Sequence, residues 1–123
     1  SADIVVLAYP MYNYSMPAAV KAWFDAVVQR GKTFEVTDKG MKGLMDGKRA
    51  LIITTSGGVY PPGSPAAMMD HSIPLARSIF AFMGYSDIEA VAAEGMSMMP
   101  QEKEALLNEA KKKLDSIAQD WYG

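Results

Sequence analysis

The fold of this chain is decided in residues 4–31, which read IVVLAYPMYNYSMPAAVKAWFDAVVQRG. The stretch opens with an unbroken apolar run rich in β-branched residues, which is typical of a strand covered on both faces. Pro17 suits the first position of a helix. Behind it, apolar residues recur at spacings of three and four until Gly31. The stretch therefore predicts a strand over 4–9, a short connection, and a helix over 17–30.

The same pattern returns twice downstream. Residues 50–55, ALIITT, form a second buried run, and a third strand with weaker alternation is expected within 87–95, DIEAVAAEG. Helices are expected over 66–83 and over 101–121, since both segments carry apolar residues on one helical face. Pro74 predicts a kink or a late start in the first of these two helices.

The resulting order is β-α-β-α-β-α, with residues 32–48 expected as a loop punctuated by glycines. Such alternation predicts an α/β domain over 1–123 with a parallel sheet, right-handed crossovers, and helices on both faces. Ligands of such sheets bind beyond the carboxyl ends of the strands. The connections at 11–15, 55–62 and 94–99 are therefore expected to meet at one edge.

Composition excludes several classes of function. The net charge is −2 and there is no cysteine. Nucleic acid is not expected as a partner, because phosphate binding needs a basic face. No apolar run approaches the roughly 20 residues of a membrane span. No metal site is expected either, since His71 is the one histidine and fits a surface or packing role better. A cytoplasmic protein with no membrane partner is the expectation.

The connections suit a flat ring with polar edges. The first offers backbone amides and Asn13 beside aromatic rings, and the second offers Thr55, Ser56 and the unhindered amides of Gly57 and Gly58. The chain has no P-loop, dinucleotide fingerprint or G-x-S-x-G elbow. A two-glycine turn is usually only a turn, and the ten methionines fit core filling as well as ligand walls. Residue types alone therefore leave the ligand open.

A family resemblance narrows the choice. Residues 10–25, PMYNYSMPAAVKAWFD, resemble the Pro-Met-Tyr-Asn-Phe segment of the flavodoxin-like FMN-dependent NADH-azoreductases and the related NAD(P)H quinone oxidoreductases. The likeness continues through 31–60, GKTFEVTDKGMKGLMDGKRALIITTSGGVY, and 80–96, FAFMGYSDIEAVAAEGM. It implies a flavodoxin-like three-layer sandwich, FMN as cofactor and NADH or NADPH as reductant. It also implies two-step hydride transfer through the flavin to a quinone or azo compound, in a homodimer with active sites at the interface.

The resemblance assigns roles to particular residues. Tyr60, where many members carry histidine, is the catalytic candidate, as a proton donor or a positioning group. Phe34 and Val36 are the candidates for substrate contact. Glu94 either approaches the cofactor edge or caps the loop that follows it. The residues implied to bind the flavin ring and its pyrimidine edge are Pro10, Met11, Tyr12, Asn13, Tyr14, Thr55, Ser56, Gly57 and Gly58.

The resemblance begins at the third strand of the family's parallel sheet. The chain is therefore expected to be the C-terminal part of one flavodoxin-like domain, without the loop that holds the FMN phosphate. Weakened FMN binding is expected, and an apolar edge strand over 4–9 would favour self-association. Two alternatives stay open: a non-catalytic half-domain that self-associates, and a flavodoxin-type electron carrier. The small net charge and the lysines at 111–113 disfavour the carrier.

Overall fold

The computed structural model describes residues 2–97 and 100–122. The three strands and three α-helices expected from the sequence are all present, with ends shifted by up to three residues, except that the helix expected from residue 66 begins only at Ile73. The elements follow in the order β1 (Ile4–Pro10), α1 (Ala18–Val27), β2 (Phe34–Thr37), β3 (Gly40–Gly43), β4 (Arg49–Thr55), the 3₁₀ helix η1 (Pro65–Met69), α2 (Ile73–Phe82), β5 (Asp87–Ala93), the 3₁₀ helix η2 (Pro100–Glu102) and α3 (Lys103–Tyr122).

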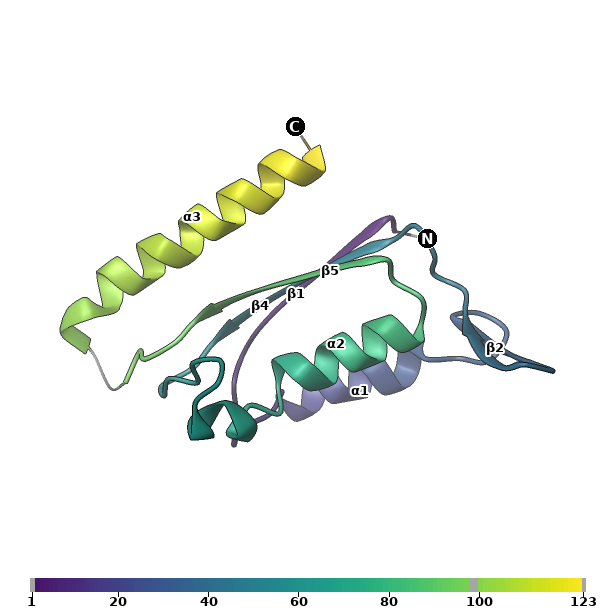
Figure 1. Ribbon diagram of the computed structural model, residues 1–123, viewed down its shortest axis with the longest axis horizontal. Coiled ribbons are helices and arrows are strands. Elements are labelled where there is room, and N and C mark those ends of the chain that lie inside the picture. The colour runs from purple at the N-terminus through teal and green to yellow at the C-terminus, as the bar shows by residue number, and fades with distance from the viewer. Residues whose placement is uncertain (1, 98–99, 123) are drawn as a thin grey trace.

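The main sheet is parallel and has the order β1-β4-β5. Figure 1 shows α1 and α2 together on one face of this sheet and α3 on the other. The predicted parallel sheet with helices on both faces is thus confirmed. The register runs from Ile4 opposite Arg49 to Pro10 opposite Thr55, so β1 and β4 end level with each other. This alignment brings the connections that follow the strands to one edge.

The dry core lies between the sheet and the helices α1 and α2. Phe24, Phe80, Ile52 and Ala50 have no exposed surface, and the rings of Phe24 and Phe80 meet edge to face with centroids 5.1 Å apart. Full burial of one such large apolar side chain contributes roughly 2 kcal/mol. Packing on this face therefore holds α1 and α2 against the sheet.

The opposite face of the sheet is covered more loosely. No residue of α3 is fully buried among the described residues, although its apolar side faces β5. The far end of α3 is held by Trp121, whose ring lies 5.6 Å from the guanidinium carbon of Arg49 at the start of β4. On the same sheet face, Val6 of β1 is 53% exposed.

One expectation was wrong in detail, because residues 32–48 contain a β-hairpin rather than an irregular loop. β2 and β3 pair antiparallel from Phe34 opposite Gly43 to Thr37 opposite Gly40. The Thr37 hydroxyl donates to the Gly40 carbonyl at 2.7 Å and closes the turn. Each strand has four residues, too few for alternation to stand out beside the glycines.

The hairpin is fixed at the amino end of the sheet. Met45 N–H donates to the Met83 carbonyl at 2.8 Å. A Cβ atom on Gly43 would overlap the backbone of Met83 and Gly84, so the close approach requires glycine there. The Phe34 ring lies 5.1 Å from Phe82 at the end of α2.

The late start predicted for the second helix is confirmed. α2 begins at Ile73, and Pro74 occupies its first turn, where its missing N–H costs nothing. The Asp70 carboxylate accepts hydrogen bonds from Ser72 N–H at 2.9 Å and Ile73 N–H at 3.3 Å. These bonds satisfy donors that the first helical turn leaves without partners.

Candidate functional site

The connection after β1 is a tight reversal of the backbone. Tyr12 N–H donates to the Ser15 carbonyl at 2.8 Å, and Ser15 N–H donates back to Tyr12 at 3.0 Å. The two residues between them, Asn13 and Tyr14, have φ angles of 49° and 67°. Two successive positive φ angles are the pattern of a type I′ turn, which asparagine accepts readily and tyrosine rarely does. Backbone strain of this kind gathers at functional sites.

Neighbouring segments hold this turn in place. Met11 N–H donates to the Thr55 carbonyl at 2.8 Å, which extends the pairing of β1 with β4 by one residue. On the other side, His71 N–H donates to the Tyr14 carbonyl at 2.8 Å, and the Ser15 hydroxyl reaches the His71 carbonyl at 3.4 Å. His71 thus contributes through its backbone, and its exposed side chain agrees with the surface role, one of the two roles expected for it.

The connection after β4 is held from behind by the connection after β5. The Ser56 hydroxyl donates to the Gly58 carbonyl at 2.9 Å and closes the bend. The links between the two connections run from Gly95 N–H to the Gly58 carbonyl (2.8 Å), from Met96 N–H to the Ser56 carbonyl (3.0 Å), from Ser97 N–H to the Gly57 carbonyl (3.2 Å), and from Tyr60 N–H to the Glu94 carboxylate (2.6 Å). The carbonyls of the glycine bend therefore face the connection after β5.

The N–H groups of the same bend are left available. Within residues 2–97 and 100–122, no hydrogen bond engages the N–H of Gly57 or Gly58, or that of Asn13 or Tyr14. Backbone N–H groups without partners on two neighbouring connections can donate hydrogen bonds to a ligand that carries several acceptor atoms along one edge.

The two connections face each other across a cavity of about 260 Å³. The Tyr14 and Tyr60 rings meet edge to face with centroids 6.4 Å apart, and Tyr14 is 48% exposed. The cavity carries no lysine or arginine among its described lining residues. It is lined by Met11, Asn13, Tyr14, Ser56, Gly57 and Tyr60.

All six of these lining residues were among the sites expected from the sequence. Four further expected residues adjoin the cavity along the chain: Pro10, Tyr12, Thr55 and Gly58. Met98 and Met99, which end the expected third connection, lie outside the described residues. The structure thus brings together, from two separate connections, the residues that were expected to bind the ring.

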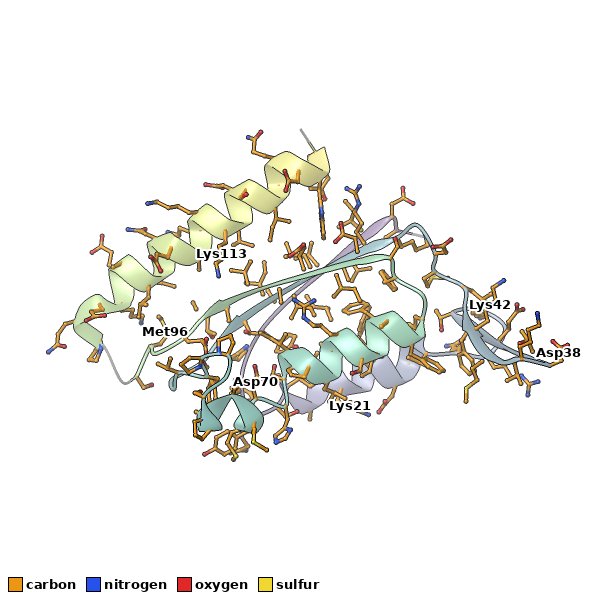
Figure 2. The ribbon with its side chains drawn as sticks, in the orientation of Figure 1. Lys21, Asp38, Lys42, Asp70, Met96 and Lys113 are labelled. Atoms are coloured by element: carbon orange, nitrogen blue, oxygen red, sulfur yellow. The ribbon has the colours of Figure 1, made fainter. Side chains whose placement is uncertain are left out.

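Phe34 and Val36 lie elsewhere. Both belong to β2, in the hairpin at the amino end of the sheet, whereas the cavity lies beyond the carboxyl ends of the strands. Figure 2 shows this separation, with Asp38 and Lys42 on the hairpin and Asp70 and Met96 at the other end of the molecule. A single chain therefore does not bring the two expected substrate contacts to the cavity.

Among the described residues, no group of three or more histidine, cysteine or acidic side chains is placed to hold a metal ion. No helix in the described part of the chain has both the length and the apolar character to cross a membrane.

Comparisons with known proteins decide the family. Residues 1–118 match the family described as having a flavodoxin-like fold. The chain belongs to this flavodoxin-like family. An FMN-dependent NADH:quinone oxidoreductase 2 of Pseudomonas fluorescens is 42% identical over 118 residues, which are 96% of this chain and 57% of that relative. An FMN-dependent NADH:quinone oxidoreductase of Rhizobium meliloti is 44% identical over 112 residues, which are 91% of this chain and 54% of the relative.

Solved structures of flavodoxin-like relatives agree. The FMN-dependent NADH-azoreductase of Bacillus anthracis str. Ames Ancestor in complex with FMN superimposes with a TM-score of 0.92 at 28% identity, over 99% of this chain and 57% of that one. The azoreductase of Bacillus anthracis str. Sterne gives 0.90 at 29% identity, over 98% and 57%. The chain thus spans a little over half the length of the relatives it matches, and its match lies in their C-terminal portion.

The lining of the cavity is chemically compatible with the flat, acceptor-rich ring of a flavin. Its free N–H groups suit the acceptor-rich edge of the ring, and the glycine bend lets the backbone approach closely. Sequence reasoning missed the support that Asp70, His71 and Ser72 give to the first connection. The aspartate two residues before a serine, with Pro74 behind it, is a helix-start signal that could have revealed this support.

Proposed function

We propose that the chain supplies the flavin-ring site of an FMN-dependent NAD(P)H oxidoreductase acting on quinones or azo compounds. In this proposal it is the C-terminal part of one flavodoxin-like domain. The observation that carries the proposal is the cavity between the left-handed turn at Asn13 and Tyr14 and the glycine bend, where the N–H groups of Gly57 and Gly58 have no hydrogen-bond partner among the described residues. Curated relatives that match nearly the whole chain are FMN-dependent NADH:quinone oxidoreductases.

Binding of the ring would fall to backbone donors and flat side chains. The N–H groups of Gly57 and Gly58 would donate to the pyrimidine edge, and Met11 and Tyr14 would line the ring. Fixed N–H dipoles stabilise negative charge that develops on a bound group, as in an oxyanion hole. A bound flavin would supply the redox chemistry, accepting hydride from NADH or NADPH and passing it to the quinone or azo acceptor.

Tyr60 would act at the rim of the site. Its ring faces Tyr14 edge to face, so it can order an aromatic acceptor beside the flavin. Its hydroxyl can also donate a proton to the acceptor, and solvent is the alternative source. A Tyr60→Phe variant separates these roles, because it keeps the ring and removes the hydroxyl.

We also propose self-association, with a homodimer as the working assembly. Phe34 and Val36 lie at the opposite end of the sheet from the cavity of their own chain. A second copy of the chain would therefore have to place its Phe34 and Val36 at this cavity. Val36 is 52% exposed, which leaves it available for such a contact. Sedimentation velocity over a range of concentrations tests this assembly. We further propose a cytoplasmic location, because NADH is available there. Cell fractionation tests this location.

The first test is a fluorescence titration of FMN with the 123-residue chain. Saturable quenching is expected, and Asn13→Ala together with Tyr14→Ala should weaken it. NADH oxidation in the presence of a quinone then separates a reductase from a flavodoxin-type carrier, since a carrier binds flavin without turning over NADH. An absence of quenching at high protein concentration would favour the non-catalytic half-domain instead.

A further inference from the structure

Glu94 follows β5 directly and reaches back to the connection after β4. Its carboxylate oxygen Oε2 accepts a hydrogen bond from Tyr60 N–H at 2.6 Å, in a partly buried position. A short bond to an ionised acceptor is roughly twice as strong as a neutral one. One oxygen of the carboxylate is thus directed to the backbone of the site.

This contact holds the far end of the glycine bend. The backbone links from the connection after β5 reach the carbonyls of Ser56, Gly57 and Gly58 and go no further. Within the described residues, the Glu94–Tyr60 bond is the only hydrogen bond to the backbone of Val59 or Tyr60. Pro61 comes next and has no N–H to offer.

The Glu94 side chain depends on its hydrogen bond to Tyr60 for its position, because a hollow lies next to it. A hollow of about 210 Å³ lies between β5 and α3, lined by Glu94, Val59, Leu106 and Lys113, among others. The Glu94 side chain therefore has room to turn away. Without the bond, Val59 could move into this hollow and draw Gly58 and Tyr60 with it.

We propose that Glu94 is a positioning residue of the ring site. Its carboxylate fixes the segment 58–60, so that the Gly57 and Gly58 amides and the Tyr60 ring keep the arrangement that faces Tyr14. The inference rests on the proposed flavin function, and it favours a site role for Glu94 over a loop cap. A displacement of about 1 Å in such a segment is enough to impair the positioning of a bound ligand.

The experiment compares three variants of the full chain with a matched control. Glu94→Ala removes the acceptor, Glu94→Asp shortens the reach by one methylene, and Glu94→Gln keeps an acceptor oxygen of the same reach without the charge. Glu104→Ala is the control, because this carboxylate lies exposed in the first turn of α3, away from the cavity. Two readouts are used: amide hydrogen exchange in the flavin-free protein, and the FMN dissociation constant from fluorescence quenching.

In the flavin-free protein, exchange of the Tyr60 amide should be about tenfold faster or more in Glu94→Ala, because a charge-assisted bond is lost. Exchange at Ile52 in the core of β4 should stay unchanged. Glu94→Gln should recover part of the protection, and Glu94→Asp should behave like alanine. The FMN dissociation constant should rise in the same order, by about tenfold for alanine.

The outcomes separate this proposal from the proposed function. Unchanged Tyr60 exchange in Glu94→Ala would overturn the positioning role, whether or not flavin binds. Lost protection with unchanged FMN affinity would overturn it as well, because the segment would not need fixing. If the parent chain binds no FMN, the flavin function fails, and Tyr60 exchange alone decides whether Glu94 fixes the segment. A uniform loss of protection that includes Ile52 and that glutamine does not rescue would mean a merely structural residue.

Discussion

The cavity depends on two residues that have a side chain and a left-handed backbone conformation. Asn13 and Tyr14 both have positive φ angles; asparagine adopts this conformation readily, but for Tyr14 it costs roughly 1 to 2 kcal/mol. The turn persists because hydrogen bonds from His71 and within the turn over-determine it. The sequence pattern predicted which residues line the ring site, but it could not predict this backbone conformation. A tyrosine in a left-handed position contradicts local preference, and only the surrounding contacts explain it.

Replacement of Tyr14 separates backbone strain from ring contact. Glycine accepts a φ of 67° freely, whereas alanine keeps the Cβ penalty and likewise lacks the ring. Tyr14→Gly should therefore unfold with a free energy about 1 kcal/mol higher than that of Tyr14→Ala, the reverse of their order in a helix. Both variants should bind FMN more weakly than the parent chain. Urea denaturation and the FMN titration measure the two effects, and equal stability of the pair would contradict a strained turn.

Tyr9, next to the first connection, gives a dependence on alkaline pH. Burial raises the pKa of its hydroxyl above the ordinary value of 10.0, the Ser72 hydrogen bond lowers this pKa, and the charge of Asp70 raises it. Burial also raises the pKa of Tyr85. The unfolded chain then releases these protons at a lower pH than the folded chain does. The free energy of unfolding should therefore be steady below about pH 10 and fall as pH rises through the folded pKa values.

Phenylalanine at either position tests this dependence. Tyr9→Phe and Tyr85→Phe should each flatten part of the decline, and the double variant should remove most of it. Tyr9→Phe also removes the hydroxyl that accepts from Ser72 at 3.4 Å, so its stability near neutral pH should fall by about 1 kcal/mol. Denaturation curves between pH 8 and about pH 11 measure both effects. The same steep decline in the double variant would rule these tyrosines out as its source.

At the scale of elements, long periodic segments were predictable and short ones were not. The strands of the main sheet and the three α-helices could be predicted from buried apolar runs and apolar helix faces in the sequence. The comparisons confirm the flavodoxin-like fold. The hairpin Phe34–Gly43 was missed because its strands are short and its glycines resemble loop punctuation. Pro74 predicted a kink or a late start of α2, and Asp70 was a readable helix-start signal, but the hydrogen bonds that Asp70 accepts at this helix start are known only from the structure.

The start of α2 is coupled to the site through residues 70–72. Asp70 accepts from Ser72 and Ile73, and the next residue, His71, donates its N–H to the Tyr14 carbonyl. Asp70→Ala should lower the free energy of unfolding by about 1 kcal/mol, as loss of a helix cap does. Exchange of the His71 amide should become faster, because its segment loses its anchor.

Asp70→Asn is the matched variant, since its side-chain oxygen can still accept both bonds. It should retain most of the stability and the slow exchange at His71. Amide exchange at Val27, in the last turn of α1, serves as the internal reference. If alanine lowered stability without a change at His71, the helix start and the ring site would be independent of each other.

For the whole molecule, the arrangement of the sheet leaves two surfaces open to partners. β1 pairs with β4 on one side, and within the described residues no strand pairs with its other side. Val6 on this strand is 53% exposed. The second surface is the hairpin, with Val36 52% exposed and Met41 68% exposed. The sequence predicted an apolar edge at β1, but which surface a second copy would use depends on the tertiary arrangement.

A matched pair of substitutions distinguishes the two surfaces. Edge strands with unpaired backbone groups invite pairing with another chain, and lysine on such a strand opposes it. If copies associate through β1, Val6→Lys should shift the chain toward monomer in sedimentation velocity, and Val36→Lys, at equal exposure, should not.

The opposite result would place the association at the hairpin, as expected if Phe34 and Val36 complete the cavity of a second copy. In that case FMN binding to the parent chain should strengthen as protein concentration rises, because association completes the cavity; Val36→Lys should remove this dependence, and Val6→Lys should keep it. A parent chain that stays monomeric at high concentration would contradict association through either surface and would leave the ring site to be formed by a single chain.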